Sequence, residues 1–292
     1  MTRDSPSECI KSFANIQTTL NDHHAPRYGR PPHRFGPPTA IFSEPLALLK
    51  YRLDHLESLT PDPLVLGSSF DLISTSASTF GNEGRREEGL KPTLQALLPG
   101  MGSWQHKTVG GSSIPDAAWL EGSFTYLIFE LKDEVGLGGD PFLQGLLVYG
   151  KVTAQKTVCS PSFLHLTRPP LNHIMQYDPV RQRSNLPVIL VTIAGNTLSV
   201  STAVFTNEIY ADKLFSTELH FGPHGSDNVF RVARVFMAIQ KAVVQLRELY
   251  RHLPNAPPCA ASNSLVAEAH RRSTRVHRTV TKTRVLCESK SR

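Results

Sequence analysis

Apolar residues along the chain follow two kinds of pattern, and each pattern predicts one kind of element. Short, nearly continuous apolar runs predict strands, whereas apolar residues three and four positions apart predict helices. The predicted strands lie in 114–132, 186–194 and 197–206, and the predicted helices in 45–58, 87–98, 141–155 and 229–252. A hairpin followed by a helix and further strands indicates an α/β fold (α+β by some schemes), in which helices flank a central mixed sheet of four to five strands.

Two of these helices have signals at their starts. The helix in 87–98 is expected to begin near Glu88, because Pro92 then lies in the first turn, where its missing amide hydrogen does no harm. Asp140 is expected to cap the helix in 141–155. Residues 64–80 are rich in serine with scattered apolar positions, and their pattern favours no element.

Residues 114–132 form the most informative stretch of the chain. Two apolar runs are separated by Glu121-Gly122-Ser123, which predicts a β-hairpin with a glycine in its loop. We expect Leu120 to pair with Phe124 across the loop. This pairing fixes which residues meet at the far end of the ribbon.

Three charged residues are expected to meet at that end. Asp116 then lies opposite Ile128, close to Glu130 and Lys132, whose side chains share a face because they are two positions apart. Carboxylates are ligands for Mg²⁺ or Mn²⁺, and a bound ion lowers the pKa of water. The sequence therefore predicts Asp116 and Glu130 as ligands of one or two ions and Lys132 as a catalytic residue. An ion pair at the edge of the sheet, without catalysis, is the alternative.

The positive charge of the chain lies in one segment. The chain has 31 Lys and Arg against 25 Asp and Glu, a formal net charge of +6. Residues 268–292 contain eight of these bases and two of the acids, so the rest of the chain is neutral. A nucleic-acid partner must therefore be bound by a local group of basic side chains, and overall charge is no evidence for one.

Composition also divides the chain into segments. Residues 1–40 are rich in Pro, His, Arg and Asn and are expected to be disordered, as is the basic tail 256–292. The predicted domain is 41–255, with an irregular, proline-containing insertion at 157–183.

The cysteines and the apolar runs bear on location. Four cysteines lie far apart without a Cys-x-x-Cys pair, which favours neither a zinc site nor a disulfide. No apolar run approaches the length of a membrane helix, and the N-terminus lacks the pattern of a signal peptide. We expect an intracellular protein of the cytoplasm or nucleus, with no membrane and no disulfide partner.

The charged residues of the hairpin also carry a family resemblance. Pro115-Asp116, thirteen further residues and Glu130-Leu131-Lys132 resemble the PD-(D/E)XK signature of restriction-endonuclease-like nucleases. In that family the acidic pair holds magnesium, the lysine positions or activates the attacking water, and a glutamate on the preceding helix often completes the site. The resemblance assigns this last role to Glu88, with Glu87 as second choice. On the following helix it gives Gln144 a supporting role, with Tyr149 nearby, as in RecB-type nucleases.

A longer stretch, about residues 80–255, resembles the N-terminal region of basidiomycete fungal-type protein kinases, in which a nuclease-like domain precedes a kinase domain. The likeness lies in residues 130–136, 140–145 and 186–206. The chain contains no His-Arg-Asp or Asp-Phe-Gly motif, so we expect no kinase domain in it. The resemblance implies a metal-dependent nuclease-like domain acting on phosphodiester bonds in DNA or RNA. The alternative is a catalytically inactive interaction module derived from such a protein.

Residues 158–176 suggest a separate hypothesis about the gene. Codons for Val158-Cys159 can form a splice donor, those for Leu171-Asn172 a branch point, and the codon for Gln176 an acceptor end. The segment spans 19 codons, an in-frame length. We hypothesise a retained intron here, and a shifted reading frame after Pro257. Sequencing of mature transcripts tests both.

Overall fold

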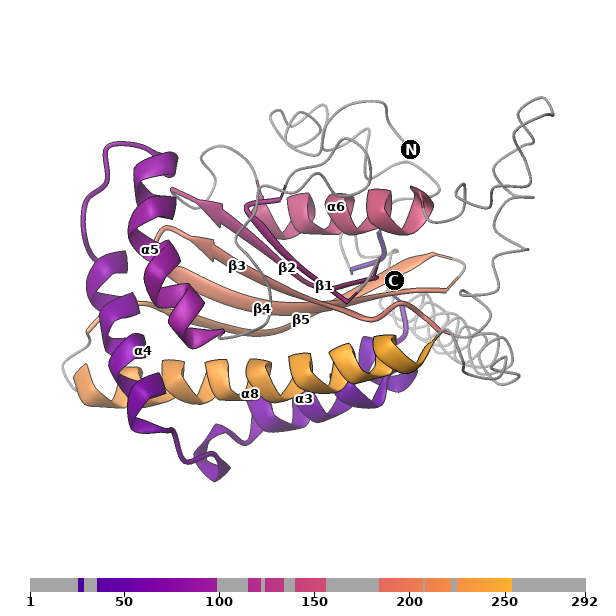
Figure 1. Cartoon of the computed structure of the whole chain (residues 1–292), viewed down its shortest axis with the longest axis horizontal. Helices are drawn as coiled ribbons and strands as arrows, with labels where there is room; N and C mark the ends of the chain where they lie inside the picture. Colours follow the sequence, from indigo (N-terminus) through magenta and orange to yellow (C-terminus); the bar gives the residue numbers. More distant parts are fainter. Residues whose placement is uncertain are drawn as a thin grey trace, which may run out of the picture.

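The computed structural model describes eight stretches of the chain: 26–28, 36–98, 115–121, 124–133, 140–155, 184–206, 208–221 and 225–253. Within them, five strands form one mixed sheet with helices on both faces, which confirms the predicted fold class (Figure 1). The predicted insertion at 157–183 and the basic tail 256–292 lie outside the described residues.

The strands of the sheet follow one another in chain order. They are β1 (Ala117–Glu121), β2 (Phe124–Lys132), β3 (Val188–Ala194), β4 (Thr197–Phe205) and β5 (Ile209–Glu218). β2 and β3 run parallel, and every other neighbouring pair is antiparallel. The parallel pair needs a long crossover, and α6 (Pro141–Gln155) lies in that connection.

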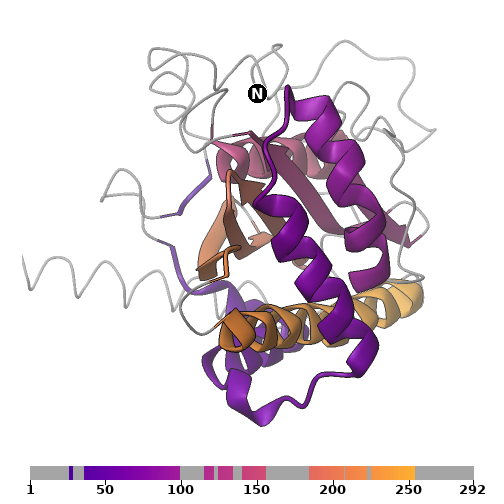
Figure 2. The same ribbon diagram turned by 90° about the vertical axis from the view of Figure 1, so that its left-hand side faces the viewer.

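Helices cover both faces and one end of the sheet. α6 covers one face, whereas α3 (Glu44–Asp54) and α8 (Gly225–His252) lie side by side on the other. α4 (Pro63–Ser76) and α5 (Glu83–Leu97) stand across the end of the sheet, in front of it in Figure 2. The larger hydrophobic core lies between the sheet and α3, α4, α5 and α8, and a smaller one lies under α6. No described helix is long and apolar enough to cross a membrane.

Several predicted helix features are confirmed. Four leucines at helical spacing in the first predicted helix are buried, Leu46, Leu49 and Leu53 in α3 and Leu56 in the short 3₁₀ helix η2 (Leu56–Ser58) that follows it. Asp140 caps α6, because its Oδ1 accepts hydrogen bonds from the amides of Phe142 and Leu143 at 2.9 and 3.1 Å. α4 occupies the stretch for which the sequence predicted no element. It begins with Pro63, and the side chain of Asp62 caps its first turn.

The predicted register of the hairpin was wrong. Glu121 pairs with Phe124, and a bulge between Trp119 and Leu120 shifts the pairing, so that Ala118 lies opposite Ile128. A bulge places one extra residue in one strand. Asp116 therefore lies beside Glu130, one position past the last pair, and not opposite Ile128 as predicted.

The predicted start of the second helix was also wrong. α5 begins at Glu83, five residues before Glu88, and the side chain of Asn82 caps it by accepting a hydrogen bond from the amide of Arg85 at 3.0 Å. Pro92 therefore lies inside the helix. Proline has no amide hydrogen, so the carbonyl of Glu88 lacks its usual partner in the helix. Pro92 is tolerated because both residues lie on the exposed side of α5.

Part of the predicted disordered segment 1–40 belongs to the fold. Arg27 forms a β-bridge with Tyr210 of the edge strand β5 and an ion pair with Glu208. Thr39 begins the 3₁₀ helix η1 (Thr39–Phe42), where its amide donates to the carboxylate of Asp212 at 2.5 Å. The boundary at residue 40 is therefore too late for the described residues 26–28 and 36–40.

Candidate functional site

The predicted charged cluster lies where β2 ends under the start of α5. Successive residues of β2 point to opposite faces, so Ile128, Glu130 and Lys132 share the face under α6, while Phe129 and Leu131 enter the larger core. The structure brings Asp116, Glu130 and Lys132 together: the charge of Lys132 lowers the pKa of both acids, and the charge of Asp116 raises the pKa of Glu130.

Asp116 is fixed to the neighbouring strand. Its Oδ2 accepts a hydrogen bond from the backbone amide of Leu131 at 2.5 Å. Burial raises the pKa of the Asp116 carboxyl to about 6, against the lowering effect of the Leu131 amide and the charge of Lys132. The charges of the nearby acids Glu83 and Glu87 contribute to this rise. Half of the Asp116 population is therefore protonated near pH 6.

Glu130 is fully buried beneath α6. The side-chain amide of Gln144 donates to Glu130 Oε2 at 2.8 Å, while Glu130 Oε1 and Gln144 Oε1 have no hydrogen-bond partner among the described residues. Burial raises the pKa of Glu130 well above its ordinary value, and the charge of Asp116 adds to this effect. A buried carboxylate with an unpaired oxygen is unfavourable for the fold unless another group binds it.

The close packing of α6 explains how Gln144 reaches Glu130. Gly145 faces β2, and a Cβ at this position would lie 3.6 Å from Glu130 Cγ and 3.7 Å from a methyl group of Leu190. A side chain larger than alanine would push α6 away from the sheet. The residue next to Gln144 therefore keeps the amide within hydrogen-bond distance of Glu130.

Lys132 pairs with an acid that the sequence analysis did not choose. Its ammonium lies 2.7 Å from Oε1 of Glu83, in the first turn of α5. Burial alone lowers the pKa of Lys132, but the hydrogen bond with Glu83 and the charges of Glu83, Asp116 and Glu130 outweigh this effect and raise it. Lys132 therefore stays charged.

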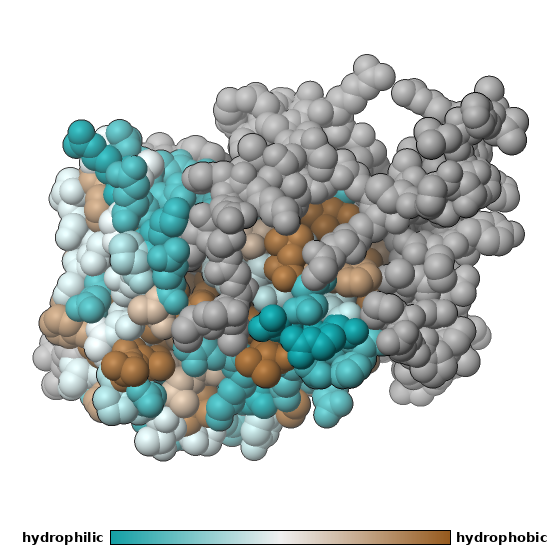
Figure 3. Space-filling model, viewed as in Figure 1, coloured by the Kyte–Doolittle hydropathy of each residue, from teal (hydrophilic) through white to brown (hydrophobic). Residues whose placement is uncertain are grey.

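Glu88, predicted to complete the site, is exposed on α5, and Glu83 contacts Lys132 instead. Residues four apart share a face of a helix, so Glu87, the second choice, lies on the side of Glu83 and influences Asp116. Glu88 is turned about 100° away from Glu87. The exposed face of α5 forms part of the hydrophilic band in Figure 3. The capping residue Asn82 was the signal in the sequence that would have placed Glu83 in the first turn.

Tyr149 does not join the cluster. Its hydroxyl donates to the carbonyl of Leu186 at 2.6 Å, at the entry to β3. A hollow of about 560 Å³ also lies elsewhere, between the starts of α3 and β3 and the end of α8. None of Asp116, Glu130 or Lys132 lines it.

The donor set fits a small, hard cation in one respect. Mg²⁺ is commonly bound by one or two carboxylates and several waters, and Asp116 and Glu130 provide such a pair, with one Glu130 oxygen unpaired. In the described part of the chain, however, no group of three or more His, Cys, Asp or Glu side chains is arranged to hold a metal ion. Among the described residues, at most these two carboxylates would coordinate an ion directly. No protein-family model, curated protein or solved structure matches the chain.

Proposed function

We propose that this chain is a metal-dependent nuclease-like domain that hydrolyses phosphodiester bonds in DNA or RNA, within the cytoplasm or nucleus. The observation that most supports the proposal is the imbalance of charge around Lys132. Asp116, Glu130 and Glu83 surround one ammonium group, and two of these carboxyls have raised pKa values. A divalent cation would offset the excess of negative charge.

Asp116 and Glu130 would hold one or two Mg²⁺ or Mn²⁺ ions. When bound, such an ion supplies charge neutralisation at a phosphate and a water of lowered pKa. The protein's own groups orient the ligands: the Leu131 amide fixes Asp116, and Gln144 fixes Glu130. Lys132, kept charged by Glu83, would orient an anionic phosphate oxygen or the attacking water.

The test is cleavage of labelled single- and double-stranded DNA and RNA with Mg²⁺ or Mn²⁺. Asp116→Asn and Lys132→Met are expected to lower the rate by about 100-fold or more, since such charge stabilisation is worth several kcal/mol. Glu121→Gln is the matched control, because it removes a carboxylate from the other end of the same hairpin. Equal rates for Asp116→Asn and the wild type would eliminate this assignment.

A catalytically inactive interaction module is the second candidate. It is favoured by the lack, among the described residues, of a third acidic, His or Cys ligand arranged with the other two. This candidate predicts no cleavage with either metal and partner binding that survives Asp116→Asn. Calorimetric titration with Mn²⁺ distinguishes the two candidate functions. A metal-dependent nuclease requires Mn²⁺ binding that Asp116→Asn weakens, whereas an inactive interaction module requires no Mn²⁺ binding.

A further inference from the structure

A second buried cation, besides Lys132, lies next to the site. Arg86 is in the first half of α5 and is only 5% exposed. Its guanidinium donates to two backbone carbonyls, those of Asp133 and Gly195. Asp133 directly follows Lys132 at the end of β2, and Gly195 directly follows Ala194 at the end of β3.

These carbonyls lie at the carboxyl end of the parallel strand pair. Lys132 and Ala194 are the last paired residues of β2 and β3, and the amide of Gly195 donates to the carbonyl of Lys132 at 3.1 Å. Beyond them the ladder offers no further amides, and buried carbonyls need donors. One side chain of α5 provides donors to both strand ends.

The spacing along α5 connects this bridge to the site. Glu83 lies three positions before Arg86, about one turn of helix, and Glu87 follows Arg86 directly. A shift of α5 along the strand ends would therefore separate Glu83 from Lys132. Arg is suited to this task because its planar guanidinium has several donors in a fixed geometry, whereas Lys offers a single point of attachment.

We propose that Arg86 is a positioning residue of the site, whose bridge to the Asp133 and Gly195 carbonyls fixes α5 so that Glu83 stays in contact with Lys132. The role of that contact in catalysis rests on the proposed function. The placement of α5 by Arg86 does not rest on the proposed function, and it can be tested without metal or substrate.

The test is a set of double-mutant cycles read by urea unfolding in EDTA. Glu83→Gln and Lys132→Met are combined in the wild-type background and again in Arg86→Lys. In the wild-type background the two changes are expected to couple by about tenfold in the unfolding equilibrium constant, within the range for contacting residues. In Arg86→Lys the coupling is expected to fall to less than about twofold, because α5 is no longer fixed.

The same coupling in both backgrounds would overturn the proposal, since Arg86 would then contribute only to stability. If Arg86→Lys does not unfold reversibly, amide hydrogen exchange under native conditions replaces the cycle. Faster exchange in α5, with unchanged exchange in α8, is expected, and unchanged exchange in α5 would count against the proposal. Absence of cleavage by the wild type would contradict the proposed function and leave this result standing.

Discussion

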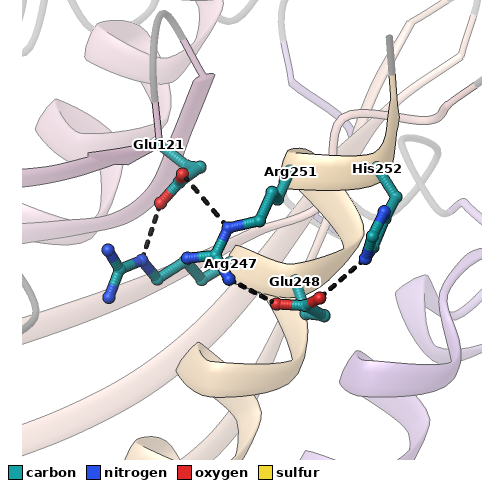
Figure 4. A network of polar contacts seen from close by, with 5 residues as sticks. All are labelled: Glu121, Arg247, Glu248, Arg251 and His252. Carbon is teal, nitrogen blue, oxygen red and sulfur yellow. Dashed lines mark hydrogen bonds and ion pairs between the residues drawn. The ribbon is translucent and has the colours of Figure 1, made fainter. Parts of the chain in front are cut away.

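The two ends of the β1–β2 hairpin both gather charged residues, but the charges are balanced at only one end. At the loop end, Glu121 accepts a hydrogen bond from Arg247 at 2.6 Å and lies 3.6 Å from Arg251. Glu248 in turn pairs with Arg251 and His252, as Figure 4 shows. Every acid in this network has a basic partner, and most of the side chains are half-exposed.

At the other end the acids outnumber the bases, and the central side chains are buried. Glu130 is fully buried and Lys132 is 8% exposed, whereas the side chain of Glu121 is 23% exposed. The pKa of Glu121 is lowered, mainly by its hydrogen bond with Arg247, while the pKa values of Asp116 and Glu130 are raised, mainly by burial. Ionisation of Glu121 thus favours the fold at the loop end, whereas ionisation of Asp116 and Glu130 opposes it at the site end.

This difference bears on why the buried acids are present. A pair of charges kept for stability would lower the pKa of its acid, as Arg247 does for Glu121. Raised pKa values indicate that the fold tolerates Asp116 and Glu130 at a loss of stability. Residues that reduce stability in this way are concentrated at functional sites. The raised pKa values at the site end, against the lowered one at the loop end, therefore favour ligand binding at the site end.

The largest predicted effect is the pH dependence of stability at the site end. Because folding raises the pKa of Asp116 from 3.8 to about 6, the folded protein binds more protons than the unfolded chain between these values. The free energy of unfolding should therefore fall as the pH rises from about 4 to 6, by on the order of 3 kcal/mol, and stay lower above. Urea unfolding in EDTA at a series of pH values measures it.

Asp116→Asn isolates this contribution, because the asparagine carbonyl can still accept from Leu131. The variant should be more stable than the wild type at pH 7.5, and the difference should shrink toward pH 4. Mn²⁺ at 100 times its dissociation constant should raise the free energy of unfolding of the wild type by about 2.7 kcal/mol and leave that of Asp116→Asn unchanged. A variant that is less stable than the wild type at pH 7.5 would show that the Asp116 charge supports the fold.

Sequence patterns predicted the layers of this fold and the proximity of Asp116, Glu130 and Lys132, whose role in a site stays a prediction. Apolar runs as long as β3 and helical spacing as regular as that of α8 are decided by local burial, so they are visible without a structure. β5 was missed because only its first residues are fully buried, and the rest of the strand has too weak an apolar pattern.

The errors within the site have different causes, some tertiary and one local. The bulge at Trp119 and Leu120 changes which residues face one another without changing the apolar pattern, so the register was not predictable from it. The helix start was misplaced because Pro92 favours the first turn of a helix, so Glu83 lay outside the predicted helix and the resemblance assigned its acid to Glu88. The bridge of Arg86 joins residues 47 and 109 positions away, which no local pattern reveals.

The next largest effect concerns the support of Glu130. Gln144→Leu removes the amide that donates to this buried carboxylate and should lower the free energy of unfolding by about 1–3 kcal/mol at pH 7.5. The loss should be smaller in a Glu130→Gln background, where no charge is left unsolvated. Thermal or urea unfolding of the four proteins measures the coupling.

Tyr149→Phe is the control on the same helix. It removes a buried hydrogen bond to the Leu186 carbonyl and should lower stability by about 1 kcal/mol, equally in both Glu130 backgrounds. If the loss of stability in Gln144→Leu is likewise the same in both Glu130 backgrounds, the Gln144 amide does not stabilise the Glu130 carboxylate. The unpaired oxygens of this pair would then no longer be evidence for ligand binding.

The smallest effect is expected at the loop end, where it should have the opposite sign with pH. Because the fold lowers the pKa of Glu121, its ion pair with Arg247 contributes above the unfolded pKa of this acid and is lost as the pH falls through the folded value. Glu121→Gln should therefore destabilise slightly at pH 7 and not at pH 3. The pair is solvent-accessible, so 1 M salt, which reduces the screening length to about 3 Å, should abolish the difference. Urea unfolding of Glu121→Gln and the wild type, at pH 3 and pH 7 and in low and 1 M salt, measures this difference in the free energy of unfolding. A difference that persists in 1 M salt would mean that the charges at this end are shielded from solvent by burial, as they are at the site.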